Sequence, residues 1–311
     1  MVKLTAAKYR FKIKVKESMI LPPYKGSTFR GGFGGVFRKI ACSQRQCSEC
    51  GPCIIKNNCP YRFIFEPGSP EQSELWNKFD EIPRPFILEP PDTRQTLFKP
   101  GETINFDLVL IGKAITYIPY FILVFKELGE VGIGKRRAKF ELISIDTVDP
   151  QGKSDAVVFD GERVYSVEND IRDLQLQDLK DRQRLTIHFQ TMTRLKVAGE
   201  LSPNPEFTVL MRALLRRLSA LQYFYTGVKL ECDFHGLVDQ ANQVKLVHDE
   251  TVWVDWERYS SRQDTRMKMG GLVGKAVYEG PWQTLAEFLA WGEILHVGKG
   301  ATFGLGKYEI L

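Results

Sequence analysis

The order of predicted strands and helices constrains this fold most, because the same order occurs in both halves of the chain. Apolar residues that alternate predict strands, and apolar residues at helical spacing predict helices. In the first half they predict a strand at 8–16, a helix at 27–41, strands near 86–88 and at 102–112, a helix at 115–128 and a strand at 139–148. In the second half they predict a strand at 185–195, a helix at 205–225, strands at 252–259 and 272–279, a helix at 282–291 and a strand at 303–310. The sequence therefore predicts an α+β protein of two tandem ferredoxin-like (βαββαβ) domains with a C-terminal glycine-rich loop.

The predicted domain boundaries follow from this repeat. The N-terminal domain spans 1–150, with a cysteine segment inserted at 42–60, and the C-terminal domain spans 184–311. A stretch rich in Asp, Gln and Lys, 151–183, is the predicted connection. A chain of 311 residues with 43% hydrophobic and 26% charged residues has the size and composition of a two-domain globular protein.

The glycine-rich stretch 298–307 lies between the last predicted helix and the last predicted strand. It holds two lysines, Lys299 and Lys307, among four glycines: Gly298, Gly300, Gly304 and Gly306. Glycines allow a polyanion to approach backbone amides closely, and lysines favour phosphate. Tyr308 follows Lys307, so the stretch is not a P-loop. A plain hairpin turn is the alternative, although a similar basic turn at 129–137 occupies the same place in the first half.

Five of the six cysteines fall within 18 residues: Cys42, Cys47, Cys50, Cys53 and Cys59. In a reducing compartment this clustering predicts a metal site rather than disulfides. Four thiolates in a tetrahedron suit zinc, while the Cys59-Pro60 ending leaves an iron–sulfur cluster as the alternative. Four ligands suffice, so one cysteine is spare.

The first strand alternates between apolar residues and the cations Arg10, Lys12 and Lys14. This pattern predicts a half-buried strand whose cationic face contacts phosphates or is simply solvated. Glycines weaken the following helix at 27–41, which indicates that another group comes close to its first turns. Arg30 is therefore a further candidate phosphate contact.

Charge and hydropathy limit the classes of partner. A net charge of +5 is compatible with a nucleic acid. No apolar run approaches the roughly 20 residues that span a bilayer, and the N-terminus lacks the form of a signal peptide. We therefore expect a cytoplasmic protein without a membrane partner.

Taken together, these motifs resemble the CRISPR repeat-processing endoribonucleases of the RAMP superfamily. The C-terminal loop is similar in its Phe303-Gly304-Leu305-Gly306 ending. A cysteine-bearing branch is similar in the cysteine pattern, in the segment 258–263 and in the double glycine at 270–271. On this match the metal ligands are Cys42, Cys50, Cys53 and Cys59, with Cys47 the spare candidate.

The resemblance implies an activity and its partners. Such enzymes cleave RNA without metal: the 2′-hydroxyl attacks the adjacent phosphate and gives a 2′,3′-cyclic phosphate. The implied partners are CRISPR repeat RNA and proteins of an effector or adaptation complex. The zinc would be structural, and catalysis would need no cofactor. A non-catalytic RAMP subunit that holds guide RNA is one alternative, and a redox protein built on the cysteines is another.

The catalytic residues are harder to assign, because better-known branches place a histidine near the first helix and this chain has none there. His296, beside the glycine-rich loop, is the preferred base or acid, and His235 is the second choice. Tyr259 and Arg262 are the predicted partners for proton transfer and charge stabilisation. Arg258 and Lys275 complete the predicted RNA-binding set.

Overall fold

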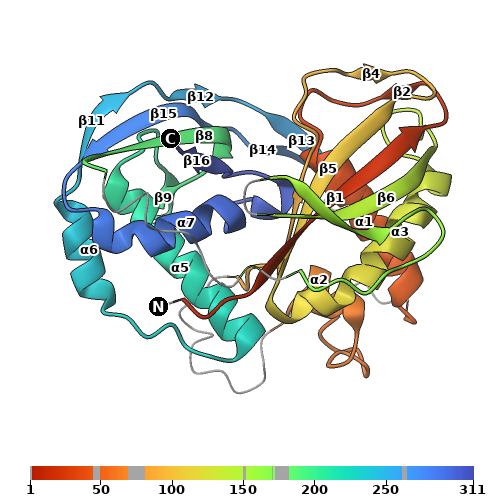
Figure 1. Cartoon of the computed structure of the whole chain (residues 1–311), viewed down its shortest axis with the longest axis horizontal. Coiled ribbons are helices and arrows are strands. Elements are labelled where there is room, and N and C mark those ends of the chain that lie inside the picture. Colours follow the sequence, from red (N-terminus) through yellow and green to blue (C-terminus); the bar gives the residue numbers. More distant parts are fainter. Residues whose placement is uncertain are drawn as a thin grey trace. The chain divides into compact units, whose positions relative to one another are not determined.

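The computed structural model describes residues 2–44, 50–68, 81–149, 152–169, 171, 182–260 and 265–311. The chain forms two compact units (Figure 1). The N-terminal unit comprises Leu4–Ile171 and Phe224–Thr226, and the C-terminal unit comprises Met1–Lys3, Arg172–Tyr223 and Gly227–Leu311. The predictions for Cys47, for Arg262 and for the side chain of Tyr259 lie outside the part that is described.

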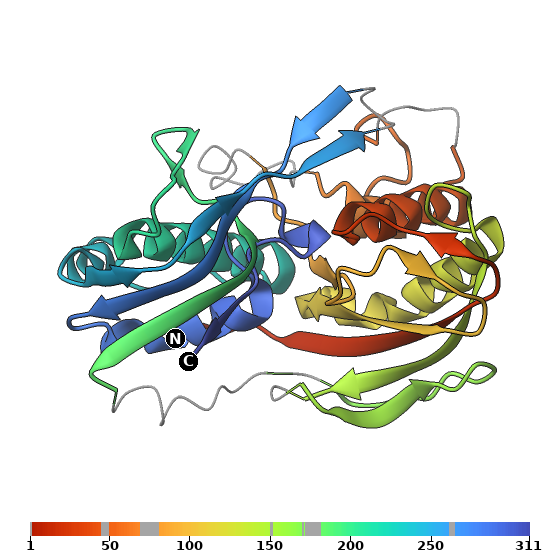
Figure 2. The ribbon, with the colours of Figure 1, turned by 90° about the horizontal axis from the view of Figure 1, so that it is seen from above.

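The N-terminal unit is an antiparallel sheet in the order β3-β5-β1-β6-β7. Its strands are β1 (Ala6–Val15), β3 (Phe86–Glu89), β5 (Thr103–Ile111), β6 (Phe140–Val148) and β7 (Ser154–Phe159). Helices α1 (Gly26–Ala41) and α3 (Ile118–Val131) lie on one side of this sheet (Figure 2). The remaining elements are β2 (Met19–Ile20), α2 (Pro60–Phe65), β4 (Leu97–Phe98) and the 3-10 turn η2 (Gly112–Tyr117).

Aromatic side chains fill the space between this sheet and its helices. Phe33 of α1 stacks on Phe121 of α3, with ring centroids 4.6 Å apart. Phe11 of β1 stacks on Phe106 of β5 at 5.1 Å. The predicted alternation of the first strand is confirmed, since its apolar residues are buried in this core.

Gly34 of α1 serves helix packing. A Cβ placed at Gly34 would lie 2.2 Å from the ring of Phe65 in α2. The group that comes close to this helix is therefore an aromatic ring of the same unit, which explains why a glycine weakens the helix there.

The C-terminal unit is an antiparallel sheet in the order β11-β15-β8-β16, with β12 also paired to β15. Its strands are β8 (Arg184–Thr193), β11 (Lys245–Asp249), β12 (Val252–Val254), β15 (Gly271–Glu279) and β16 (Tyr308–Ile310). Two hairpins accompany it: β9 (Lys196–Val197) with β10 (Glu200–Leu201), and β13 (Glu257–Ser260) with β14 (Thr265–Lys268). The helices are α5 (Phe207–Thr226), α6 (Phe234–Asn242) and α7 (Ala286–Leu295), with 3-10 turns η3 (Gln283–Leu285) and η4 (Ala301–Phe303).

Buried tyrosines join this sheet to its helices. Tyr278 of β15 packs on Phe207 of α5 at 5.2 Å and donates its hydroxyl to the Pro205 carbonyl. Tyr308 of β16 donates its hydroxyl to the Leu289 carbonyl of α7. Both hydroxyls thus satisfy polar groups that would otherwise be costly to bury.

Some predicted elements differ from the observed ones. The predicted strand 252–259 is split between β12 and β13, and the last strand begins only at Tyr308 because η4 occupies 301–303. Sequence analysis missed α2, α6 and β11, all of which are short. Among the described helices, none is both long and apolar enough to cross a membrane.

Candidate nucleic-acid interface

The glycine-rich loop is held by close packing of its own backbone. Its four glycines, Gly298, Gly300, Gly304 and Gly306, have φ between 74° and 86°. A Cβ at Gly306 would lie 1.8 Å from the Val297 carbonyl oxygen, and one at Gly298 would lie 2.4 Å from that of Arg194. The Val297 amide donates to the Gly306 carbonyl at 2.9 Å and closes the loop. Glycine is therefore required here by the fold itself.

Several loop amides already donate to carbonyls of the same unit. The acceptors are Arg194 for the Lys299 amide (3.1 Å), Gly300 for Phe303 (2.9 Å), Ala301 for Gly304 (2.8 Å) and Met192 for Gly306 (3.2 Å). Gly304 and Gly306 are also buried. The prediction that these two glycines contact RNA is therefore corrected: their backbone faces the protein. Lys299 is exposed, while Gly298, Gly300 and Lys307 are half-buried.

His296 is part of the same packing. It has φ of 57°, which is uncommon outside glycine, and its side chain is fully buried. Its Nδ1 lies 3.1 Å from the Leu305 carbonyl oxygen, so the ring bridges the two ends of the loop. This placement fits a structural role and argues against the predicted role of base or acid, which needs access to RNA.

Two arginines converge on the loop. The Arg258 guanidinium of β13 lies 4.5 Å from the centre of the Phe303 ring, and within the described residues its buried Nε has no hydrogen-bond partner. Arg194 follows β8, and its Nη1 donates to the Lys268 and Gly270 carbonyls, each at 3.0 Å. Burial lowers the pKa of both arginines below the ordinary value. The structure thus joins the β13–β14 hairpin to the loop.

Sequence reasoning identified Arg258 and missed Arg194. The only signal for Arg194 was its place beside Lys196 at the end of a predicted strand. Its importance depends on contacts with residues more than 70 positions away.

The other predicted residues of this unit do not join this group. His235 is exposed in the first turn of α6. Figure 1 shows α6 beside the start of α7, where Thr284 donates to Gln240 at 2.7 Å, whereas the loop follows the other end of α7. Ten helical residues separate these ends by about 15 Å. Lys275 is exposed on β15.

Carboxylates balance the cationic face of β1. Arg10 forms two hydrogen bonds with Asp107 of β5, at 2.9 and 3.0 Å, and that carboxylate raises the pKa of Arg10. Lys12 and Lys14 are exposed. The cationic side chains of β1 therefore do not all face solvent alone, because the neighbouring strand supplies an acid opposite Arg10.

Arg30 also has a protein contact. Its guanidinium lies 4.2 Å from the centre of the Phe65 ring. The aromatic ring that packs against Gly34 is thus also the one that Arg30 covers, which favours a packing role for this arginine.

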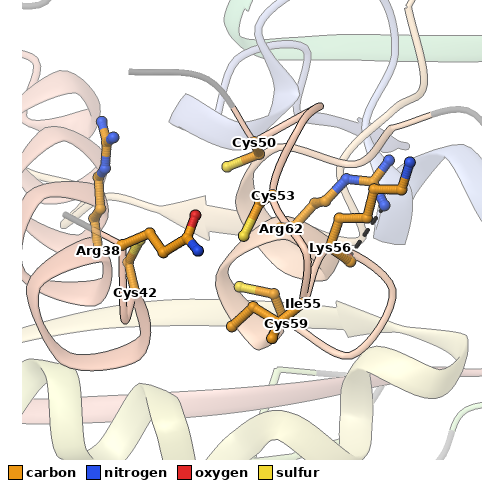
Figure 3. A pocket seen from close by; sticks show the side chains of 9 residues that line it. Arg38, Cys42, Cys50, Cys53, Ile55, Lys56, Cys59 and Arg62 are labelled. Carbon is orange, nitrogen blue, oxygen red and sulfur yellow. Dashed lines mark hydrogen bonds between the residues drawn. The ribbon is translucent and has the colours of Figure 1, made fainter. Parts of the chain in front are cut away.

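The four predicted metal ligands of the N-terminal unit line one small pocket. Cys42 lies at the end of α1, Cys59 precedes α2, and Cys50 and Cys53 lie between them (Figure 3). Among the described residues, no three His, Cys, Asp or Glu side chains already form a group able to hold a metal ion.

Comparison with known proteins places this chain among its relatives. Residues 4–173, more than half of the chain, match the family model AF_1859_N, an N-terminal domain. The chain belongs to this family. Residues 187–308 match the model of the CRISPR-associated endoribonuclease Cas6. The predicted resemblance to CRISPR repeat-processing RAMP proteins is confirmed by these matches, while the cysteine-bearing branch stays a prediction.

Similar proteins cover nearly the whole chain. An uncharacterized protein of Archaeoglobus fulgidus is 26% identical over 309 residues, which cover 93% of this chain and 92% of the relative. A Cas6 product complex has a TM-score of 0.58 at 13% identity, covering 98% of this chain and 100% of the other. A partial Cas6-RT-Cas1–Cas2 complex has a TM-score of 0.57 at 13% identity, covering 100% of this chain and 46% of the other. These structures show that the fold is Cas6-like.

Proposed function

We propose that this protein is a metal-independent endoribonuclease that cleaves CRISPR precursor RNA within its repeats. The observation that carries the proposal is the match of residues 187–308 to the Cas6 endoribonuclease family. This range contains the whole glycine-rich loop and the β13–β14 hairpin that contacts it. The released guide RNAs would be the products.

The topology supports the finer description of the fold as two tandem ferredoxin-like domains. In each unit the first core strand lies between the third and the fourth, and the second lies beyond the third. These are the orders β3-β5-β1-β6 and β11-β15-β8-β16, and the neighbouring strands are antiparallel. A βαββαβ unit gives this order when its two helices cover one face of the sheet.

RNA phosphates would contact side chains around the loop rather than loop amides. Lys299 is exposed, and Arg258 is half-buried with its guanidinium over the Phe303 ring of the loop. Arg194 holds the hairpin and the loop together. Guanidinium groups bind phosphate oxygens through several donors at once, so this arrangement suits a backbone contact.

The proposed reaction is a transesterification. A base removes the proton of the ribose 2′-hydroxyl, the oxygen attacks the adjacent phosphorus, and the bond to the 5′ oxygen of the next nucleotide breaks. That oxygen takes a proton, which leaves a 2′,3′-cyclic phosphate and a 5′-hydroxyl. Cations near the phosphate stabilise the charge that develops. No oxidant, reductant or metal is needed for this balance.

The hairpin is the better place to seek the proton-transfer group. Its Arg258 contacts the loop, and Tyr259 and Arg262 follow Arg258 within four positions of the sequence. His296 is buried, and His235 lies on a helix at the other end of α7. We therefore favour Tyr259 and Arg262 over both histidines.

A non-catalytic RAMP subunit that holds guide RNA is the second candidate. The burial of His296 favours it, since the imidazole nearest the loop is unavailable to RNA. All four histidines also lie in the second half of the chain. Such a subunit would bind the repeat and leave it intact. An adaptation partner fits either function, because a Cas6-RT-Cas1–Cas2 complex is among the similar structures.

One assay separates these functions. Purified protein is incubated with end-labelled repeat RNA from an adjoining repeat array, in EDTA, and the product ends are mapped. We expect one cut per repeat with a cyclic phosphate, and no cut when the 2′-hydroxyl at that position is replaced by hydrogen. Tight repeat binding without cleavage would favour the second candidate. If the protein neither binds nor cleaves the repeat RNA, both candidate functions are refuted.

A further inference from the structure

We propose that Cys42, Cys50, Cys53 and Cys59 bind a single zinc ion, which holds the connection between α1 and α2 in place. This site is separate from the proposed RNA contacts, which lie in the other unit. It does not depend on the proposed nuclease activity. The inference rests on the backbone anchors of the cysteines, their common pocket, the exposure of the connection and the charges around it.

Each cysteine lies at a defined point of the backbone. Cys42 is the C-cap of α1, where its amide donates to the Arg38 carbonyl at 3.0 Å. Cys59 is the N-cap of α2, and its carbonyl accepts from the Phe63 amide at 3.0 Å. Cys50 and Cys53 lie at the two ends of a turn, in which the Cys53 amide donates to the Cys50 carbonyl at 3.3 Å. A turn of this kind places two thiolates on one ion.

The four thiols line the same pocket of about 10 Å³. Figure 3 shows the sulfur atoms of Cys50, Cys53 and Cys59 pointing toward the side of the pocket where Cys42 lies. No three of the described ligand-type side chains are yet close enough to hold a metal ion. Zinc binding therefore requires these thiols to turn toward a common centre.

Within the described residues 50–58, the connection has few apolar contacts with the core. Ile54 is 87% exposed and Ile55 is 40% exposed, so its apolar side chains do not anchor it in the core. Within the described residues 50–58 the backbone forms only turns. A tetrathiolate zinc site supplies the folding free energy that such a segment lacks.

The charges around the pocket suit a bound tetrathiolate. Zinc with four thiolates carries a net charge of −2, and the cations Arg38, Lys56 and Arg62 line the pocket with the thiols. Arg62 is fixed there by donating from Nη1 to the Lys56 carbonyl at 3.2 Å. These cations would offset part of the negative charge of the bound site.

The test begins with the metal content of the full-length chain, purified anaerobically from cells. We expect about one zinc per chain by elemental analysis. Cobalt added to the chelator-treated protein should give the d–d and sulfur-to-cobalt charge-transfer bands of a tetrahedral thiolate site. Absence of both zinc and the cobalt bands, or iron with acid-labile sulfide, would overturn the proposal.

Substitutions identify the ligands. Cys53→Ser, on the exposed connection, should lower zinc content and abolish the charge-transfer band, and Cys50→Ser should do the same. The matched control Cys232→Ser, in the other unit, should keep both. Cys47→Ser should also keep both, and loss of zinc in that variant would refute the proposed ligand set. The cobalt spectrum of the unsubstituted chain keeps the test decisive if a variant fails to fold.

Discussion

Replacing Gly306 by alanine tests whether the glycine-rich loop is held by backbone packing. Gly306 has φ of 74°, and a Cβ added there would lie 1.8 Å from the Val297 carbonyl oxygen. Atoms cannot remain that close, so the two segments must separate. The hydrogen bond from the Val297 amide to the Gly306 carbonyl spans the same two residues and would be lost.

The expected cost has two parts. A left-handed backbone conformation costs an L-residue about 1–2 kcal/mol. Loss of the closing hydrogen bond adds about 1 kcal/mol, and more if its buried groups stay unpaired. We therefore expect Gly306→Ala to lower the free energy of unfolding by about 2–3 kcal/mol, and by more if the buried groups stay unpaired.

The matched control is Gly227→Ala at the end of α5. Gly227 has φ of 76°, nearly the same as Gly306, and nothing lies within 4 Å of an added Cβ. This variant should lose only the conformational part, about 1–2 kcal/mol. The difference between the two variants isolates the contact with Val297.

Urea unfolding followed by tryptophan fluorescence measures this difference. Four of the five tryptophans, Trp253, Trp256, Trp282 and Trp291, belong to the C-terminal unit, which contains both glycines. With a urea dependence of about 1–3 kcal/mol/M, a loss of about 2–3 kcal/mol shifts the midpoint by roughly 0.7–3 M. Equal midpoints for Gly306→Ala and Gly227→Ala would refute the packing argument.

Three further predictions address charge, protonation and the loop histidine. Arg258→Gln should weaken repeat-RNA binding and reduce the slope of log affinity against log salt by roughly 0.7, whereas Arg10→Gln should leave that slope unchanged; equal effects in filter-binding titrations would contradict the assignment. Burial raises the pKa of Glu293 to about 7 from its ordinary 4.5. Between these two pH values the folded state binds a proton that the unfolded state has lost. The free energy of unfolding should therefore fall by up to about 3 kcal/mol as the pH rises from about 4.5 to about 7. Glu293→Gln should remove this part of the pH dependence in urea titrations, and an unchanged profile would show that the carboxyl does not titrate there. His296→Ala should lower the free energy of unfolding, because its contact with Leu305 is lost. The folded variant should keep the single-turnover cleavage rate. A roughly 100-fold slower rate would show that His296 takes part in catalysis.

Local patterns in the sequence predicted some features well. The alternation in the first strand identified its buried face, because each side chain's face follows from its position along one strand. The glycine density near the C-terminus identified a loop in which glycine is required, although packing rather than phosphate explains Gly304 and Gly306.

Long-range pairing lay beyond those patterns. Arg10 meets Asp107 because β1 and β5 pair in a particular register, and 97 positions separate the two residues. Nothing local to the first strand reveals that carboxylate. His296 likewise looked available beside a loop of small residues, yet the loop folds over it through Leu305. Burial and pairing are set by the tertiary fold, so sequence alone overestimated the exposed charge and the accessible imidazole.

The loop's use of its own amides bears on how RNA would be bound. Amides that already donate to Arg194, Gly300, Ala301 and Met192 cannot also cradle a phosphate without breaking those bonds. Recognition then falls to the side chains that the closed loop displays, namely Lys299 and the Arg258 that covers Phe303. Side-chain cations bind phosphate largely through charge, so affinity at this site should depend strongly on salt. The glycines would contribute to RNA binding indirectly, by fixing the conformation of the loop on which the Arg258 side chain packs.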